Sequence, residues 1–169
     1  MSPQPDLYWA QLRQVKAGAL YMRLYRNRLA RQVQAVELVK AIGSSGAIAG
    51  WVIWSDLPLL WSGIIAAAQL LDALKGVFPF AKLHRAASDL TVAMEIIWID
   101  ADAEWTDIYA GRLTDQEINK RLQKLRRLVL EAENKHFPDG FETDAKLATL
   151  AEQETRSYLK VTYEEEVKP

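Results

Sequence analysis

The feature that most constrains this chain is an apolar stretch in its middle, over about residues 36–80. It consists of two segments with almost no charge, residues 41–55 and 57–71, which meet at Ser55-Asp56. Two apolar helices joined by a short turn are buried either in a lipid bilayer or in the core of a helical protein. What covers this hairpin therefore decides what kind of protein the chain can be.

The shortness of the two segments argues against a membrane. Each has fifteen residues, so as a helix it extends about 22 Å, whereas the hydrocarbon core of a bilayer is roughly 30 Å thick. To span it, the first helix would have to begin near Val36 and keep Glu37 and Lys40 at the interface. The second would have to continue past Asp72 and Lys75. A hairpin buried in a soluble helical bundle is the alternative.

Small and aromatic residues argue for a membrane. Gly46 and Gly50 are four positions apart, a spacing that lets two helices approach closely in lipid. Trp51, Trp54 and Trp61 gather around the turn, as in the aromatic belt at a membrane interface. We therefore predict that the hairpin is transmembrane.

The charge distribution predicts the orientation of this hairpin. Residues 13–40 carry seven Lys and Arg and one acid, Glu37, and form an amphipathic pattern before the first apolar segment. Lys75, Lys82 and Arg85 follow the second segment. By the positive-inside rule both ends of the hairpin, and with them both termini, face the cytoplasm. The N-terminal helix is either a basic helix on an anionic inner leaflet or the solvated face of a bundle helix.

The residues after the hairpin predict a helical body. A long helix is expected from about Lys82 to Tyr109, because its apolar residues recur every three or four positions. This near-heptad seam packs either within the chain or along an oligomer axis. Thr114 and Glu117 form a capping box at the start of the next helix, and Thr143 is expected to cap the last one. The seam consists of Leu83, Ala87, Leu90, Met94, Ile97, Ala101, Trp105 and Ile108.

The chain shows no strand-like alternation of polar and apolar residues, so the fold is predicted to be all-α. We expect three parts. They are a basic N-terminal amphipathic helix over residues 1–35, the transmembrane hairpin over residues 36–80, and a cytoplasmic helical bundle or coiled-coil region over residues 81–169.

Residues for catalysis or metal binding are scarce. The chain has no cysteine, and its two histidines, His84 and His136, are far apart in sequence. No phosphate-binding loop, dinucleotide-binding motif, serine-hydrolase motif or zinc-protease motif occurs. Asp100, Asp102 and Glu104 could contact a divalent ion, but they do not share one helix face and are expected to be a solvated surface. We expect no enzyme activity, no cofactor and no metal.

Two groups of cations could bind an anionic ligand. His84 and Arg85 follow the hairpin and could touch a phosphate, although a juxtamembrane pair needs no ligand. Arg121, Lys124 and Arg127 form the best place for a nucleotide. The alternative is a solvated helix exterior whose cations pair with the neighbouring acids.

The second apolar segment carries polar residues on one face. Ser62, Gln69 and Asp72 are separated by seven and three positions, so they share a face, and Ser44 and Ser45 could contribute from the first helix. Repeated around a symmetric oligomer such as a tetramer, this stripe would line a water-filled path. The alternatives are that Asp72 pairs with an interfacial lysine and that each serine bonds to its own helix. Two helices cannot enclose a pore, so a channel requires a homo-oligomer.

The order of these parts along the chain resembles that of a known protein family. A basic amphipathic segment (ALYMRLYRNRLA) precedes the apolar hairpin, and the long helix from Lys82 follows it. Over residues 7–135 this layout resembles the SLATT-type two-transmembrane effectors of bacterial anti-phage defence systems. The resemblance implies a pore-forming or membrane-disrupting effector of the bacterial inner membrane that kills the infected cell (abortive infection). It also implies release by a partner enzyme or by a nucleotide or oligonucleotide signal, and no catalytic residues.

The sequence thus predicts an oligomeric membrane pore or ion channel, gated by its cytoplasmic helices and acting in anti-phage defence. The alternative is a membrane-anchored helical adaptor that binds a protein partner without conducting ions. In both hypotheses the lipid bilayer is a partner of the chain.

Overall fold

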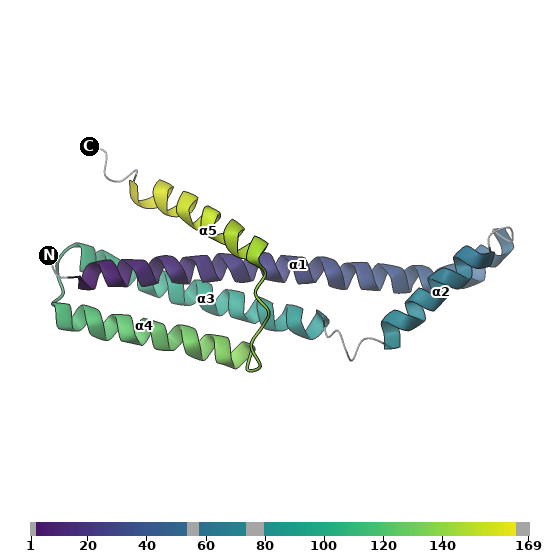
Figure 1. The fold of residues 1–169 in the computed structure, drawn as a ribbon, viewed down its shortest axis with the longest axis horizontal. Helices are drawn as coiled ribbons and strands as arrows, with labels where there is room; N and C mark the ends of the chain where they lie inside the picture. Colours follow the sequence, from purple (N-terminus) through teal and green to yellow (C-terminus); the bar gives the residue numbers. More distant parts are fainter. Residues whose placement is uncertain (1–2, 54–57, 74–79, 165–169) are drawn as a thin grey trace. The chain divides into compact units, whose positions relative to one another are not determined.

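The computed structural model describes residues 3–53, 58–73 and 80–164 of the 169-residue chain (Figure 1). Within the helices, nothing is described for the side chains of residues 42–53, 58, 60, 61, 64, 71, 72 and 164. The helices are α1 (Gln4–Ile53), α2 (Pro58–Ala73), α3 (Phe80–Tyr109), α4 (Asp115–His136) and α5 (Ala145–Leu159), followed by a π-helical turn, η2 (Lys160–Glu164). No strand occurs in the described ranges, so the predicted all-α fold is confirmed.

The chain divides into two compact units. The bundle unit combines residues 1–26 with residues 86–169, and the hairpin unit is residues 27–85. Both boundaries fall inside a helix, one in α1 and one in α3. The first residues of the chain therefore belong with its last helices, whereas the sequence grouped them as a separate basic segment.

The core of the bundle unit is built from one apolar face of each helix. On α1 five buried residues, from Tyr8 to Met22, recur every three or four positions, which is the spacing of one helix face, and Leu20 and Tyr21 are buried beside them. The seam predicted on α3 supplies the facing surface. Because most of that seam is buried within the chain, the structure supports the first of the two alternatives, packing within the chain. The core includes Tyr8, Leu12, Val15, Ala19 and Met22 of α1, Ala87, Leu90, Met94, Ile97, Ala101 and Ile108 of α3, Ile118, Leu122, Leu125 and Ala132 of α4, and Ala151 and Leu159 of α5.

A glycine brings α1 and α3 close together. A Cβ atom on Gly18 would lie 2.9 Å from the Cε atom of Met94, a separation below normal van der Waals contact. Because Gly18 has no side chain, the end of the Met94 side chain of α3 can pack directly against the backbone of α1.

The helix ends follow local rules that the sequence shows. The predicted capping box is present, because the Thr114 backbone N–H donates to the Glu117 carboxylate (2.8 Å) and the Glu117 N–H donates to the Thr114 hydroxyl (3.4 Å). Gly111 adopts a φ of 67° just after α3, where a glycine is favoured. The prediction for the last helix is wrong by one residue. Asp144, not Thr143, caps α5, and its carboxylate accepts from the N–H groups of the next turn at 2.8 and 3.1 Å.

The hairpin unit contains the end of α1, all of α2 and the start of α3. α2 has 16 residues, which corresponds to about 24 Å of helix. In the part of the chain that the structure describes, no helix combines the length and the apolar character needed to cross a membrane, so the transmembrane character predicted for the hairpin is not supported. Trp54, Ser55 and Asp56, at the predicted turn, lie outside the described residues.

Candidate functional site

Two of the predicted pore-lining side chains are described. Ser62 and Gln69 are both exposed on α2, seven residues apart and therefore on one side of the helix. Ser44 and Ser45 fall within α1, and Asp72 falls within α2, but their side chains lie outside the described part of the structure. The pore lining stays a prediction.

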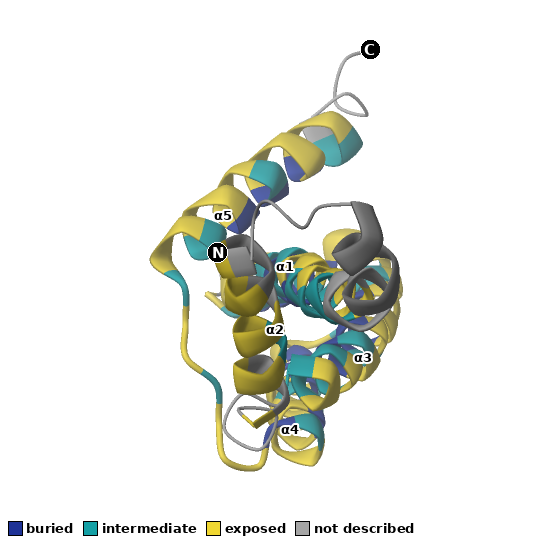
Figure 2. Ribbon diagram, turned by 90° about the vertical axis from the view of Figure 1, so that its right-hand side faces the viewer, coloured by how far each residue is buried: buried dark blue, intermediate teal, exposed yellow. Residues whose placement is uncertain are grey.

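Beside these polar residues, α2 exposes an apolar face, which Figure 2 shows as exposed along the described part of the helix. Leu59 is 88% exposed and Leu70 is 60% exposed. Gly63 and Ala66 lie between them at helical spacing, and a Cβ added to Gly63 would meet no atom within 4 Å. We call Leu59, Gly63, Ala66 and Leu70 the α2 face. An uncovered apolar face of this kind marks a surface that contacts lipid or another protein.

The cations predicted to hold a nucleotide come together on α4. Arg121, Lys124 and Arg127 line one surface hollow of about 780 Å³, together with Lys120, the residue before Arg121. The only lining cation with a carboxylate within 4.0 Å in the described structure is Lys124, whose Nζ atom is 3.8 Å from Oε1 of Glu104. The hollow therefore retains a positive field that can attract an anion.

Neither Glu117 nor Glu131, the acids nearest these cations in sequence, forms an ion pair with them in the described structure. Glu117 lines the same hollow, but its carboxylate accepts from the backbone N–H and the hydroxyl of Thr114, and these bonds lower its pKa. Within the described residues, Glu131 has no cation within 4.0 Å. His84 and Arg85 belong to the hairpin unit and are not among the residues that line the hollow.

A buried tyrosine that the sequence did not single out orients the acid beside this hollow. The hydroxyl of Tyr8 donates to the Ala101 carbonyl (3.2 Å) and to Oε2 of Glu104 (3.0 Å). Burial, with the nearby Glu104 carboxylate second, raises the pKa of Tyr8 well above its usual value. Because Tyr8 keeps its proton, its hydroxyl group donates a hydrogen bond to Glu104, and Glu104 in turn lies 3.8 Å from Lys124. The signal in the sequence was the position of Tyr8 four residues before the buried Leu12.

A lysine between two aromatic rings ties α5 to the bundle. The Nζ atom of Lys16 lies 3.6 Å from the ring centroid of Trp98 and 4.1 Å from that of Tyr158. Burial lowers the pKa of Lys16, and the Glu95 carboxylate opposes that shift. A cation between two ring faces is held by their negative quadrupoles, so Lys16 joins α1 to α3 and α5 at one point.

A cavity that sequence reasoning missed lies in the bundle unit, between α4 and α5. It has a volume of about 420 Å³, and residues of α1 and α3 form its floor. Its position depends on where α5 docks, and α5 is separated from α3 in sequence by an entire helix. The only hint in the sequence was Gly18, a small residue within the amphipathic pattern of α1.

The described residues contain no group of three histidine, aspartate or glutamate side chains arranged to hold a metal ion. In the acidic run of α3, Asp102 accepts a hydrogen bond from the Tyr163 hydroxyl, and Glu104 is engaged by Tyr8 and Lys124. Comparison of the chain with protein-family models, with curated proteins and with solved structures finds no match.

Proposed function

We propose that this protein is a membrane-associated helical effector whose hairpin unit enters the bilayer through the α2 face. The observation that carries the proposal is the exposure of Leu59 and Leu70 on a helix whose one charged residue is Asp72, next to its last residue. Leucine side chains left in water are unfavourable by roughly 1.5–3 kcal/mol each relative to burial. A lipid bilayer can bury such an apolar face without presenting a complementary protein surface.

The length of α2 limits how it can insert. Its 16 residues give about 24 Å of helix, so it is shorter than the roughly 30 Å hydrocarbon core. Short apolar helices are accommodated by local thinning of the bilayer and by oligomerisation. Both responses are those of a pore-forming or membrane-disrupting protein rather than of a passive anchor. We propose that several copies assemble, with Ser62 and Gln69 on the water-facing side.

The resemblance to the SLATT-type effectors supports the same proposal at the level of layout. It suggests that the chain acts in anti-phage defence in the bacterial inner membrane and that the bundle unit keeps it inactive until a signal arrives. The α4 hollow, with Arg121, Lys124 and Arg127, is suited to an anionic signal such as a nucleotide.

The experiment expresses the chain in bacteria and measures membrane sedimentation without detergent, together with membrane potential by a dye. Leu70→Asp should move the protein out of the membrane pellet and abolish depolarisation, because an aspartate in a bilayer-embedded helix costs about 3 kcal/mol. The matched control is Leu130→Asp on α4, where the leucine is 57% exposed, close to the 60% of Leu70. The control should behave as wild type. Wild-type protein that stays in the supernatant would contradict the proposal.

A separate variant distinguishes a pore from an anchor. Gln69→Leu keeps the helix apolar, so it should retain membrane sedimentation but change the depolarisation. If conductance is the same in wild type and Gln69→Leu, the proposed lining is wrong while the membrane association stands.

A second candidate function, an adaptor that binds a protein, is favoured by the outer side of α3. Val92, Ile96 and Ile99 are 56%, 54% and 58% exposed and lie on the side of the helix opposite its buried face. Glu95 and Asp100 flank this stripe, and neither has a cation within 4.0 Å among the described residues. An apolar stripe with acidic edges fits an amphipathic partner helix with basic edges.

The adaptor candidate is tested with a designed probe. A synthetic amphipathic helix with a leucine stripe and lysine edges should bind the chain, whereas the same helix with glutamate edges should not. Ile96→Asp should remove the binding, and Leu130→Asp should leave it unchanged. Equal binding of the two peptides would argue against this surface.

A further inference from the structure

The cavity of the bundle unit lies in a groove that the last two helices form around the first. α1 runs between α4 and α5, and residues 137–144 connect these two helices at one end (Figures 1 and 2). Hydrogen bonds fix both sides of this groove. Nε of Arg126 donates to Oε1 of Gln11 (3.1 Å) on the α4 side, and the N–H of Asp144 donates to the hydroxyl oxygen of Tyr21 (3.0 Å) on the α5 side.

The floor of the cavity is apolar and belongs to the core. Its lining includes Val15, Met22, Leu90, Met94 and Ala151, each at most 3% exposed. Two of these five are methionines, whose unbranched and polarisable side chains adapt to ligands of different shape. The lining also includes Ala17, whose side chain is a single methyl group, and Gly18, against which the end of Met94 packs. A volume of about 420 Å³ is within the usual range of small-molecule pockets.

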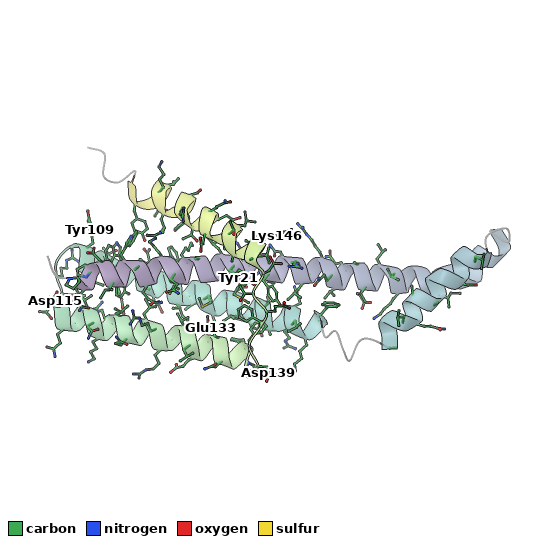
Figure 3. All side chains as sticks on the ribbon, in the orientation of Figure 1. Tyr21, Tyr109, Asp115, Glu133, Asp139 and Lys146 are labelled. Atoms are coloured by element: carbon green, nitrogen blue, oxygen red, sulfur yellow. The ribbon has the colours of Figure 1, made fainter. Side chains whose placement is uncertain are left out.

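The rim of the cavity is polar, and its charges are all negative. Glu133 of α4 and Glu152 of α5 line it from opposite walls, and no lysine, arginine or histidine is among the lining residues. Neither carboxylate has a cation within 4.0 Å in the described structure. Tyr21 and Glu133 lie near the α4–α5 connection, where Figure 3 labels both side chains. A ligand whose charged group is negative would be repelled by this rim, whereas a positive group would be attracted.

We propose that this cavity binds a small amphiphilic organic cation. The apolar part of the ligand rests on the floor of Met22 and Met94, and its ammonium group lies at the rim beside Glu133 and Glu152. Apolar contact supplies most of the affinity and the carboxylates supply the preference for a positive charge, as in other pockets that combine an apolar lining with a few polar groups. This ligand class differs from the anion expected in the α4 hollow, so the bundle unit carries two sites of opposite charge preference.

The site also has a consequence for regulation. A ligand in the groove contacts α1, α3, α4 and α5 at once, so it binds only when α5 is docked. By linkage, its binding energy then favours the docked arrangement of α5 over any undocked one. All residues that line the cavity belong to the bundle unit, so ligand binding does not require membrane insertion of the hairpin unit.

The test uses three ligands of nearly equal shape and different charge on the full-length chain. They are 2-phenylethylamine (positive), 2-phenylethanol (neutral) and phenylacetate (negative), each titrated to 10 mM while binding is followed by NMR chemical-shift changes and by the melting temperature. The amine should bind most tightly and phenylacetate least. An amine that binds no better than phenylacetate would overturn the proposal, as would the absence of binding by all three.

Variants locate the site. Glu133→Gln and Glu152→Gln should each weaken binding of the amine about 1.5- to 5-fold, the range for an exposed ion pair, without changing binding of the alcohol. Glu142→Gln removes an exposed carboxylate that does not line the cavity and should change neither. Ala148→Leu fills the cavity from α5 and should remove binding of both ligands, while circular dichroism reports on its fold. Amine binding that survives Ala148→Leu in a folded protein would refute the location.

Discussion

The most informative single substitution is Tyr8→Phe, because it removes one hydroxyl group and leaves the ring in place. The ring of Tyr8 is fully buried, so the change creates almost no cavity. The lost group donates to the Ala101 carbonyl at 3.2 Å and to the Glu104 carboxylate at 3.0 Å. A hydrogen bond to a charged acceptor is worth about 1.5–3 kcal/mol, and a neutral one about 1 kcal/mol. One proton shared between the two acceptors gives an expected loss of about 2 kcal/mol.

The measurement is urea denaturation combined with thermal melting. In a chain of 169 residues, a loss of about 2 kcal/mol lowers the melting temperature by about 4–8 °C. The control is Tyr109→Phe at the last residue of α3, where the tyrosine is 75% exposed and the expected change is below about 0.5 kcal/mol. A Tyr8→Phe variant as stable as this control would refute the assignment of the hydrogen bonds.

The same substitution has a defined pH dependence. The pKa of Tyr8 is raised in the folded chain, so the folded state keeps the proton above pH 10, where an ordinary tyrosine in the unfolded chain loses it. The stabilising contribution of Tyr8 is therefore complete below about pH 10 and decreases as the pH rises further. The stability difference between wild type and Tyr8→Phe should shrink between about pH 9 and 11. Lys16 has the opposite sign, because its pKa is lowered, but its contribution cancels in this difference. A constant difference would show that Tyr8 does not titrate as described.

Two further substitutions test the close packing and the capping. Gly18→Ala should be nearly neutral, because alanine gains up to about 1 kcal/mol of helix propensity while its Cβ displaces only the flexible end of Met94, and Gly18→Val should destabilise by about 1–3 kcal/mol. Equal stability of the two variants in urea denaturation would contradict the close approach. Thr114→Ala should cost about 1 kcal/mol by removing the side-chain acceptor for the Glu117 N–H, and thermal melting that shows no change would mean that α4 does not need its cap.

The features that the sequence predicted correctly are local or periodic. The capping box needs only Thr114 and Glu117, three residues apart, and forms as expected. The seam of α3 follows from the spacing of its apolar residues, and the structure buries most of it. The sequence could not say which surface covers that seam, because periodicity identifies a face but not its partner. The surface that covers the α3 seam is α1, whose first residues the sequence predicts to be a separate basic helix.

The apolar hairpin shows the opposite case. Composition, the tryptophans around the turn and the flanking cations predict that it spans a membrane. None of these features determines how long its helices are. α2 has 16 residues, and the two leucines whose side chains the structure describes, Leu59 and Leu70, are exposed instead of forming a core. For the predicted ligand residues, Arg121, Lys124 and Arg127 meet because they share one face of α4, a relation that helical spacing contains.

The way α5 is attached has a consequence for how the molecule opens. Only three of its residues, Ala151, Thr155 and Leu159, are buried. Its other contacts include the aromatic pair around Lys16, the Arg23–Glu154 ion pair at 3.6 Å and the hydrogen bond from Asp144 to Tyr21, and the turn after it is held by Tyr163. A helix with so few buried contacts separates from its neighbours at a lower free energy than the three-helix core unfolds. Its backbone amides should therefore exchange with deuterium before those of α1 and α3. We therefore expect α5, one wall of the α4–α5 groove, to undock and redock while α1, α3 and α4 stay folded.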